Sequence, residues 1–138
     1  MARDISSAAL AMRLARRRAA FKLGRAAEAV AAEFLRSQGL EIIERNFRRR
    51  HAEIDLVARD HDTLIVVEVR SRSSNQFGGA AASVDARKQR RIVLGTHLML
   101  QRNEKFTRMR VRFDVVIVED VLAEKPRVRW IQQAFLAT

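Results

Sequence analysis

The sequence of 138 residues contains no cysteine, a single proline and only three histidines. The absence of cysteine excludes disulfides and thiolate metal sites, and it fits a reducing compartment. Because the histidines are scattered, at positions 51, 61 and 97, we expect no structural zinc site. No apolar run approaches the roughly 20 residues that span a bilayer. The sequence therefore predicts a cytoplasmic protein without a transmembrane segment.

Acidic residues are scarce relative to basic ones. Twenty-seven Lys and Arg oppose sixteen Asp and Glu, which gives a formal net charge of +11. A charge of this size attracts polyanions such as DNA, RNA or an anionic membrane. Most of the cations are arginine, whose planar guanidinium binds phosphate oxygens in pairs. The pattern favours a nucleic acid as partner; the alternative is that these cations only solvate the surface.

The first part of the chain has its own composition. Residues 1–20 are rich in arginine and alanine, which is also typical of an organelle transit peptide. We favour a basic N-terminal arm or helix extension, because the basic character continues through the rest of the chain. Residues 21–138 are then predicted to form a single domain, since 48% hydrophobic residues suffice for one core.

The order of apolar patterns predicts an α/β fold, with a mixed sheet flanked by helices. Apolar residues spaced by three and four predict a helix over about Leu23–Gln38, which Gly39 ends. A second helix, with Ser83 as its N-cap, is predicted to run to about Arg102. Alternating or β-branched segments predict strands. These segments are Leu40–Phe47, Ile54–Ala58, Thr63–Arg70, Val111–Val118 and a short last strand at Val128–Ile131.

Acidic residues in the predicted hairpin need an explanation in so basic a protein. If Asp60–Thr63 form a four-residue turn, Asp55 lies opposite Glu68, with Cβ atoms about 4.5–5.5 Å apart. Arg70 lies two residues beyond Glu68 and so shares its face. Opposed carboxylates repel, and a Mg²⁺ or Mn²⁺ ion between them would remove that penalty. Surface ion pairs with arginine are the simpler alternative.

A series of short motifs in a fixed order then points to a family. The motifs are Leu23–Glu28, Arg45–Arg48, Ala52–Val57, Val67–Arg72, Phe77–Gly78, Lys88 and Arg112–Val116. They resemble the YraN family of uncharacterised bacterial proteins, which is similar to the PD-(D/E)XK nucleases and Holliday-junction resolvases. The resemblance implies a restriction-endonuclease-like core, with a helix, a three-strand meander, a second helix and a further strand.

The resemblance also implies roles for individual residues. Asp55 and Glu68 match the two metal-binding acids, and Glu28 matches the first-helix glutamate that completes the acidic site. Arg70 stands where the family's pattern has lysine. A guanidinium stays charged, so Arg70 can stabilise charge but cannot act as a base, which puts cleavage in doubt. Lys88 in the second helix is a further candidate for the missing ammonium.

Basic clusters around these motifs are the predicted nucleic-acid contacts, because arginine and lysine bind phosphates. The predicted contacts are Arg48, Arg49, Arg50, Arg72, Arg87, Lys88 and Arg91. Phe77 in the predicted loop is expected either to cover the core or to stack on a base.

The leading hypothesis is a metal-dependent, structure-selective DNA endonuclease, with Glu28, Asp55, Glu68 and Arg70 at its catalytic site. The main alternative is a non-catalytic nucleic-acid-binding module with a degenerate nuclease site. A third hypothesis is an adaptor that binds a membrane surface or a protein through the basic arm. Because the related resolvases act as dimers, the resemblance also implies a homodimer.

Overall fold

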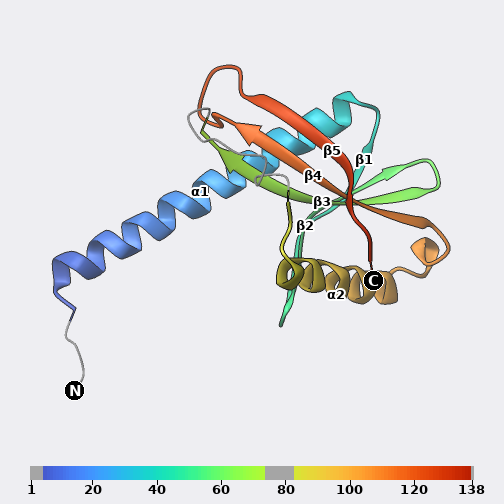
Figure 1. The fold of residues 1–138 in the computed structure, drawn as a ribbon, viewed down its shortest axis with the longest axis horizontal. Helices are drawn as coiled ribbons and strands as arrows, with labels where there is room; N and C mark the ends of the chain where they lie inside the picture. The colour runs from blue at the N-terminus through green and yellow to red at the C-terminus, as the bar shows by residue number, and fades with distance from the viewer. Residues whose placement is uncertain (1–4, 74–82, 138) are drawn as a thin grey trace.

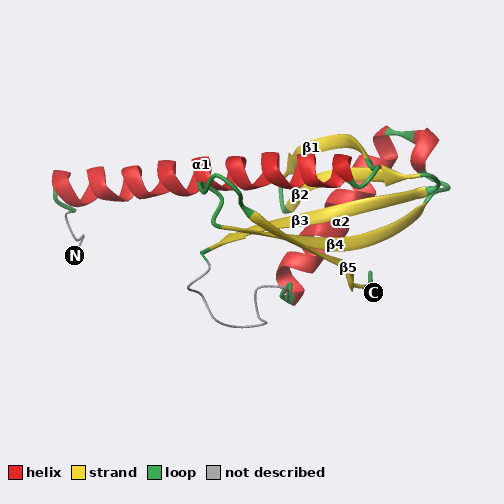
Figure 2. Ribbon diagram, turned by 90° about the horizontal axis from the view of Figure 1, so that it is seen from above, coloured by secondary structure: helices red, strands yellow, loops and turns green. Residues whose placement is uncertain are grey.

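A five-stranded sheet lies between two helices in the computed structural model, which describes residues 5–73 and 83–137 (Figures 1 and 2). Helix α1 spans Ser7–Ser37 and helix α2 spans Ala86–Arg102, and a 3₁₀ turn, η2, follows at Glu104–Phe106. The strands are β1 (Glu41–Arg49), β2 (Ala52–Asp60), β3 (Thr63–Arg72), β4 (Arg110–Glu119) and β5 (Arg127–Phe135).

The strands lie in chain order across the sheet. Strands β1, β2 and β3 form an antiparallel meander, β4 runs parallel to β3 after the crossover through α2, and β5 is antiparallel to β4. The central strands β3 and β4 are buried on both faces, which explains their continuous β-branched runs. The predicted fold is confirmed: it is a mixed α/β sheet with the element order of a restriction-endonuclease-like core.

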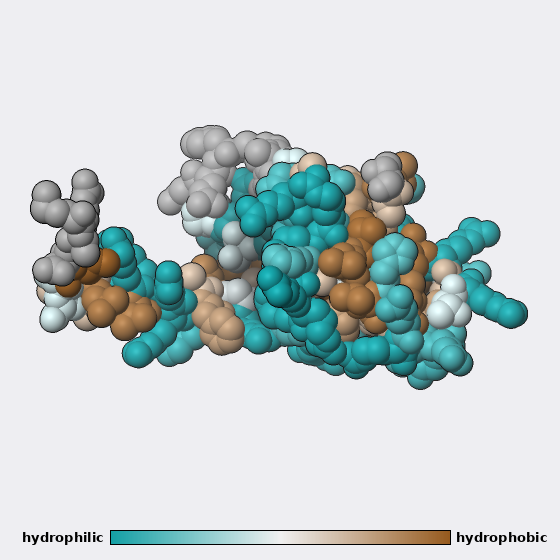
Figure 3. All heavy atoms as spheres, turned by 90° about the horizontal axis from the view of Figure 1, so that it is seen from below, coloured by the Kyte–Doolittle hydropathy of each residue, from teal (hydrophilic) through white to brown (hydrophobic). Residues whose placement is uncertain are grey.

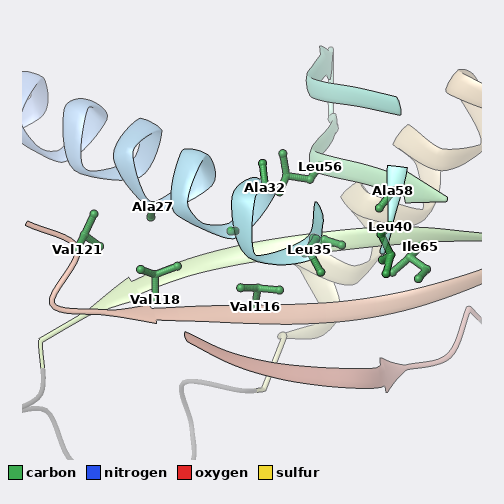
Figure 4. Close-up of a cluster of buried hydrophobic side chains, with 12 residues drawn as sticks. Ala27, Ala32, Leu35, Leu40, Leu56, Ala58, Ile65, Val116, Val118 and Val121 are labelled. Atoms are coloured by element: carbon green, nitrogen blue, oxygen red, sulfur yellow. The ribbon is translucent and has the colours of Figure 1, made fainter. Parts of the chain in front are cut away.

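Each helix covers one face of the sheet. Ala27, Ala31 and Leu35 of α1 pack on buried residues of β2, β3 and β4, and this cluster is drawn in Figure 4. Helix α2 packs Ile92 and Met99 against the opposite face. Small alanines on α1 let the helix approach the sheet closely, so side chains at its edge can reach the strand ends.

Helix α1 begins at Ser7, well before the predicted start near Leu23, and residues 7–20 of the predicted arm belong to it. The Ser6 hydroxyl accepts a hydrogen bond from the Ala9 N–H and caps the helix. Alanine, leucine and arginine are strong helix formers, so the helix continues where no core contact requires it. The periodicity of buried residues missed this part because its side chains are exposed.

Other boundaries also differ from the predictions, and β2, β3 and β4 each extend one or two residues further than expected at one or both ends. Helix α2 is capped by Asp85, whose Oδ1 accepts from the Lys88 N–H at 2.8 Å, and not by Ser83. Strand β1 extends to Arg49, two residues beyond the predicted end at Phe47, and β5 is longer at both ends than predicted. Phe77 lies outside the described residues. Over residues 5–73 and 83–137, no helix combines the length and apolar character needed to cross a membrane.

Candidate active site

The predicted register of the central hairpin is confirmed, since Ala58 pairs with Ile65 and Arg59 with Leu64. The backbone pairs between β2 and β3 end at Leu56 and Val67, one residue before the two acids. At that point the Oδ2 atom of Asp55 accepts a hydrogen bond from the Val69 N–H at 2.8 Å. The side chain of Asp55 therefore joins the two strands where their backbone ladder stops.

Strand β2 changes its facing at the same point. Ile54 packs in the cluster beneath α2, whereas Leu56 packs in the cluster beneath α1. Regular pleating would put residues two apart on one face, so the alternation is broken at Asp55. Asn46 on the neighbouring strand β1 has a left-handed φ of 54°, which marks the same irregularity. The break brings Asp55 within reach of groups from both layers.

Glu68 is the most perturbed group in this region. Its side chain is hydrogen-bonded to that of Asp55, and the residue is only 8% exposed. Burial, together with the charge of Asp55, raises the pKa of Glu68 to about 8, although Lys88 and Arg70 act in the opposite direction. At neutral pH Glu68 is therefore mainly protonated, because burial and the neighbouring charge of Asp55 both disfavour its charged form.

Glu28 reaches the same region from α1. It is 9% exposed, and burial and the charge of Asp55 raise its pKa, while a hydrogen bond with the Asn46 side chain lowers it. Within the described chain its Oε2 atom has no hydrogen-bond partner; the nearest cation is Arg25, whose guanidinium nitrogen lies 3.6 Å away. Asp55 thus interacts electrostatically with both of the other predicted acids, Glu28 and Glu68.

Lys88 of α2 lies on the other side of this acidic pair. Its Nζ is 3.7 Å from Oε2 of Glu68 and forms a short hydrogen bond with Oε1 of Glu53. Burial alone would lower the pKa of Lys88, but the bond to Glu53 and the charge of Glu68 raise it. Lys88 is therefore a fully charged ammonium held against the acids.

Three of the predicted phosphate-binding cations form ion pairs with Glu53. Arg48 donates to its Oε2 at 2.8 Å, while Lys88 and, at 3.4 Å, Arg91 approach its Oε1. Burial alone would raise the pKa of Glu53, yet the bond from Lys88 and the three positive charges lower it. Sequence analysis assigned no role to Glu53 or to Asn46. The sequence did offer one indication: Glu53 lies between two groups of basic residues, and an acid in that position can form ion pairs with both.

The other predicted residues lie further out. Arg70 is half-buried on β3, and its charge lowers the pKa of Glu68. Arg49 stacks over the Phe47 ring at 4.5 Å, and Arg50 and Arg87 are exposed. Arg72 is the last residue of β3 and lies 3.9 Å from Glu119. The predicted contacts therefore form one cluster at Glu53 and several separate positions, rather than one continuous strip.

The sheet and its two helices define the class of fold as a restriction-endonuclease-like core, with acids from α1, β2 and β3 and a lysine from α2 at one place. The chain belongs to the uncharacterised protein family UPF0102, whose model matches residues 27–118. The resemblance to the YraN family is thereby confirmed. Every predicted site residue, from Glu28 to Arg91, lies within the matched range.

Curated relatives cover most of the chain. A UPF0102 protein of Hahella chejuensis is 46% identical over 113 residues, which span 82% of this chain and 89% of the relative. UPF0102 proteins of Pseudomonas aeruginosa and Pseudomonas putida are 45% and 42% identical, over 81% and 83% of this chain and 90% and 93% of the relatives.

Proposed function

We propose that this protein is a metal-dependent, structure-selective DNA endonuclease. The observation that carries the proposal is the convergence of Asp55 and Glu68, from neighbouring strands, in a chain with a net charge of +11. A basic surface accounts for attraction to a nucleic acid. It does not account for a buried pair of acids, which is a feature typical of catalytic sites.

The residues present fit a divalent cation such as Mg²⁺ or Mn²⁺. Burial and the charge of Asp55 raise the pKa of Glu68, and a cation bound between the two carboxylates would offset both effects. Glu28 Oε2 is buried without a hydrogen-bond partner among the described residues. No group of three or more His, Cys, Asp or Glu within residues 5–73 and 83–137 is arranged as a complete metal site. Two carboxylates completed by water and phosphate oxygens are what Mg²⁺ usually accepts.

Asp55 and Glu68 would hold the ion, which when bound would polarise the phosphoryl group and lower the pKa of a water ligand. Hydrolysis forms a bond from a water oxygen to phosphorus and breaks the bond from phosphorus to a sugar oxygen, which takes up a proton. The role of Glu28 is to hold and orient water beside Asp55, since its free oxygen can accept a hydrogen bond.

The lysine of the nuclease pattern is supplied in this proposal by Lys88, with Arg70 in a supporting role. Lys88 forms an ion pair with Glu68, whereas Arg70 influences Glu68 only through its charge. An ammonium at this place stabilises the negative charge that develops on the phosphate in the transition state. Glu53 acts as a positioning residue, because it fixes Lys88, Arg48 and Arg91 together.

A second candidate is a nucleic-acid-binding module without turnover. It is favoured by Arg70 at the lysine position and by the Glu53–Lys88 bond, which engages the only nearby lysine among the described residues. In that case the cations would bind phosphate, and Glu68 would remain protonated beside Asp55.

Cleavage of labelled four-way junction, flap and linear DNA in Mg²⁺ or Mn²⁺ tests the proposal. We expect the native protein to cut branched DNA and Asp55→Asn to abolish cutting. Lys88→Ala should lower the rate about 10²-fold or more, as loss of a transition-state cation does. Lys125→Ala, which removes an exposed lysine on the β4–β5 connection, is the charge-matched control and should cut normally.

Other outcomes separate the two candidates. Binding without cleavage by the native protein, with cleavage gained in Arg70→Lys, would favour the module that has lost turnover. Cleavage retained in Asp55→Asn would identify a contaminant. A native protein that neither binds nor cuts any of these DNAs would overturn both candidates.

A further inference from the structure

The first half of α1 extends away from the rest of the molecule (Figures 1 and 2). From residue 7 to residue 23 its side chains are exposed, apart from a half-buried Ala9, and the first buried residue of the helix is Ala27. At 1.5 Å per residue this segment is about 26 Å long. We call residues 7–23 the α1 arm; it lies outside the part of the chain that the family model matches.

The α1 arm carries one sign of charge. Arg13, Arg16, Arg17, Arg18 and Lys22 lie within it, and no Asp or Glu occurs between Ser7 and Ala27. None of these five cations forms an ion pair with another described residue. The arm is therefore a concentrated positive charge that its own domain does not neutralise.

The cations surround the helix instead of lining one side. At 100° per residue, Arg17, Arg18, Lys22 and Arg16 lie about 40°, 140°, 180° and 300° around the axis from Arg13. Exposed apolar side chains lie between them on two separate sides, with Leu10, Leu14 and Phe21 on one and Met12 and Leu23 on the other. Figure 3 shows polar and apolar side chains intermingled along the arm.

This distribution discriminates between partners. A helix that lies on a membrane collects its cations on one face and its apolar residues on the other, which the arm does not do. A second copy of the arm would bring five further uncompensated cations alongside, and like charges repel. A rod that is positive on all sides is complementary to a polyanion, which can approach it from any direction.

The arm is also a helix that a polyanion would stabilise. Arg13 and Arg17, and likewise Arg18 and Lys22, are spaced i, i+4, where like charges cost about 0.2–0.5 kcal/mol per pair. Without packing against the domain, a helical segment of this length is only marginally stable in water. Phosphates that neutralise the cations remove this repulsion, so binding should increase the helix content of the arm.

We propose that the α1 arm binds the phosphate backbone of a nucleic-acid duplex, at a distance from the acidic site. Its length matches about eight base pairs at 3.4 Å each. The proposal rests on the nucleic-acid binding of the proposed function, but it does not require cleavage. The arm would extend the binding surface of the family's core along the flanking duplex, which raises affinity without adding sequence readout.

The test compares the binding of three full-length proteins to a duplex of about 30 base pairs. The first is the native chain, and the second is a variant in which glutamine replaces Arg13, Arg16, Arg17, Arg18 and Lys22. The third is a control in which alanine replaces Leu10, Leu14 and Phe21. Glutamine and alanine both preserve helix propensity. The dissociation constant is measured between about 50 and 200 mM salt, and far-UV circular dichroism follows helix content.

We expect the glutamine variant to lose up to about 4.5 from the slope of log affinity against log salt, which is 0.9 for each of five phosphate contacts. The native chain and the alanine control should bind alike and gain helix signal on adding DNA, whereas the glutamine variant should not. An unchanged slope in the glutamine variant would overturn the role of the arm and leave the proposed function standing.

Absence of binding by the native chain would overturn both the arm and the proposed function. Stronger binding to vesicles of anionic lipid than to the duplex, lost in the alanine control, would replace the nucleic acid by a membrane as partner of the arm. Cleavage at saturating DNA, if it occurs, should be equal in all three proteins, because the arm does not reach the acidic site.

Discussion

Asp55 accepts a hydrogen bond from the Val69 N–H at 2.8 Å, and this bond lies just beyond the last backbone pair of β2 and β3. The same carboxyl group is hydrogen-bonded to Glu68. One side chain therefore has two roles, which are to close the sheet at this point and to place an acid beside a second acid. Two substitutions separate them.

Asp55→Asn and Asp55→Ala both remove the charge, but only asparagine keeps an oxygen that can accept from Val69. We expect Asp55→Asn to be at least as stable as the native protein, because the repulsion with Glu68 is gone. Asp55→Ala should be about 1–3 kcal/mol less stable than Asp55→Asn, since the part-buried Val69 N–H loses its partner. Urea unfolding of both variants measures the difference, and equal stabilities would contradict a structural role for the bond.

Glu68 makes the stability of the protein depend on pH in a specific window. The folded protein holds its proton up to about pH 8, whereas the unfolded chain releases it near the ordinary value of 4.5. The free energy of unfolding contributed by this group therefore falls as the pH rises from about 4.5 to 8. Glu68→Gln removes this pH dependence. The free energy of unfolding of the variant, relative to that of the native protein, should therefore rise by a few kcal/mol from about pH 4.5 to pH 8.

The measurement for Glu68 is urea unfolding at several pH values between 4.5 and 9, without divalent metal. Glu33→Gln, which removes an exposed acid paired with Arg36, is the control and should follow the native curve. If the difference between native and Glu68→Gln stays constant with pH, the proton is not held by Glu68.

Two glycines give opposite predictions for the same substitution. A Cβ added to Gly95 of α2 would lie 3.1 Å from Ile54 Cγ1 and 3.3 Å from the backbone N and O of Glu53, whereas one added to Gly24 of α1 meets nothing within 4 Å. Gly24→Ala should stabilise by about 0.5–1 kcal/mol through helix propensity. Gly95→Ala should instead destabilise by about 1–3 kcal/mol, because β2 must move.

Thermal or urea unfolding of the two glycine variants tests this contrast. A shift of β2 at Glu53 also displaces its cations, so Gly95→Ala should weaken duplex binding while Gly24→Ala leaves it unchanged. Stabilisation by both alanines would show that α2 packs less closely on β2 than the structure indicates.

Asp114 is a buried acid of another kind. It is fully buried and accepts two hydrogen bonds from Arg112, one from Trp130 Nε1 and one from the Gln133 N–H, all at 2.8–2.9 Å. Asp114→Ala should destabilise by about 1–3 kcal/mol, because it leaves the half-buried Arg112 and two N–H groups without their acceptor.

Trp130 is the only tryptophan, so its fluorescence reports directly on the Asp114 network. The emission of Asp114→Ala should shift in the folded state, and its urea midpoint should fall. Glu124→Ala, an exposed acid in the turn before β5, should leave both unchanged. A normal midpoint in Asp114→Ala would mean that the β4–β5 pairing does not depend on this acid.

The hairpin register could be predicted from the sequence because the turn at Asp60–Thr63 fixes every pair behind it. The facing of Asp55 could not, since the break in alternation depends on the left-handed Asn46 of another strand. The composition of the α1 arm set it apart in the sequence. Its helical structure could not be predicted from apolar periodicity, because neither side of the arm is buried.

Sequence analysis named Lys88 as a candidate for the missing ammonium, but its contacts with Glu53 and Glu68 could not be predicted. It lies 35 residues from Glu53 in the chain, and only the crossover through α2 brings the two together. Motif comparison pointed to Arg70, the residue at the expected position. In the structure Lys88, the second candidate, is the one in contact with Glu68, and it also binds Glu53, to which sequence analysis assigned no role.

The acidic centre draws on α1, β1, β2, β3 and α2, five successive elements that contribute Glu28, Asn46, Asp55, Glu68 and Lys88. No piece of the chain shorter than residues 28–88 can assemble it. During synthesis on the ribosome, the charges meet only after the second helix has emerged and docked. Truncated or proteolysed products therefore carry the basic segments but cannot carry the completed centre.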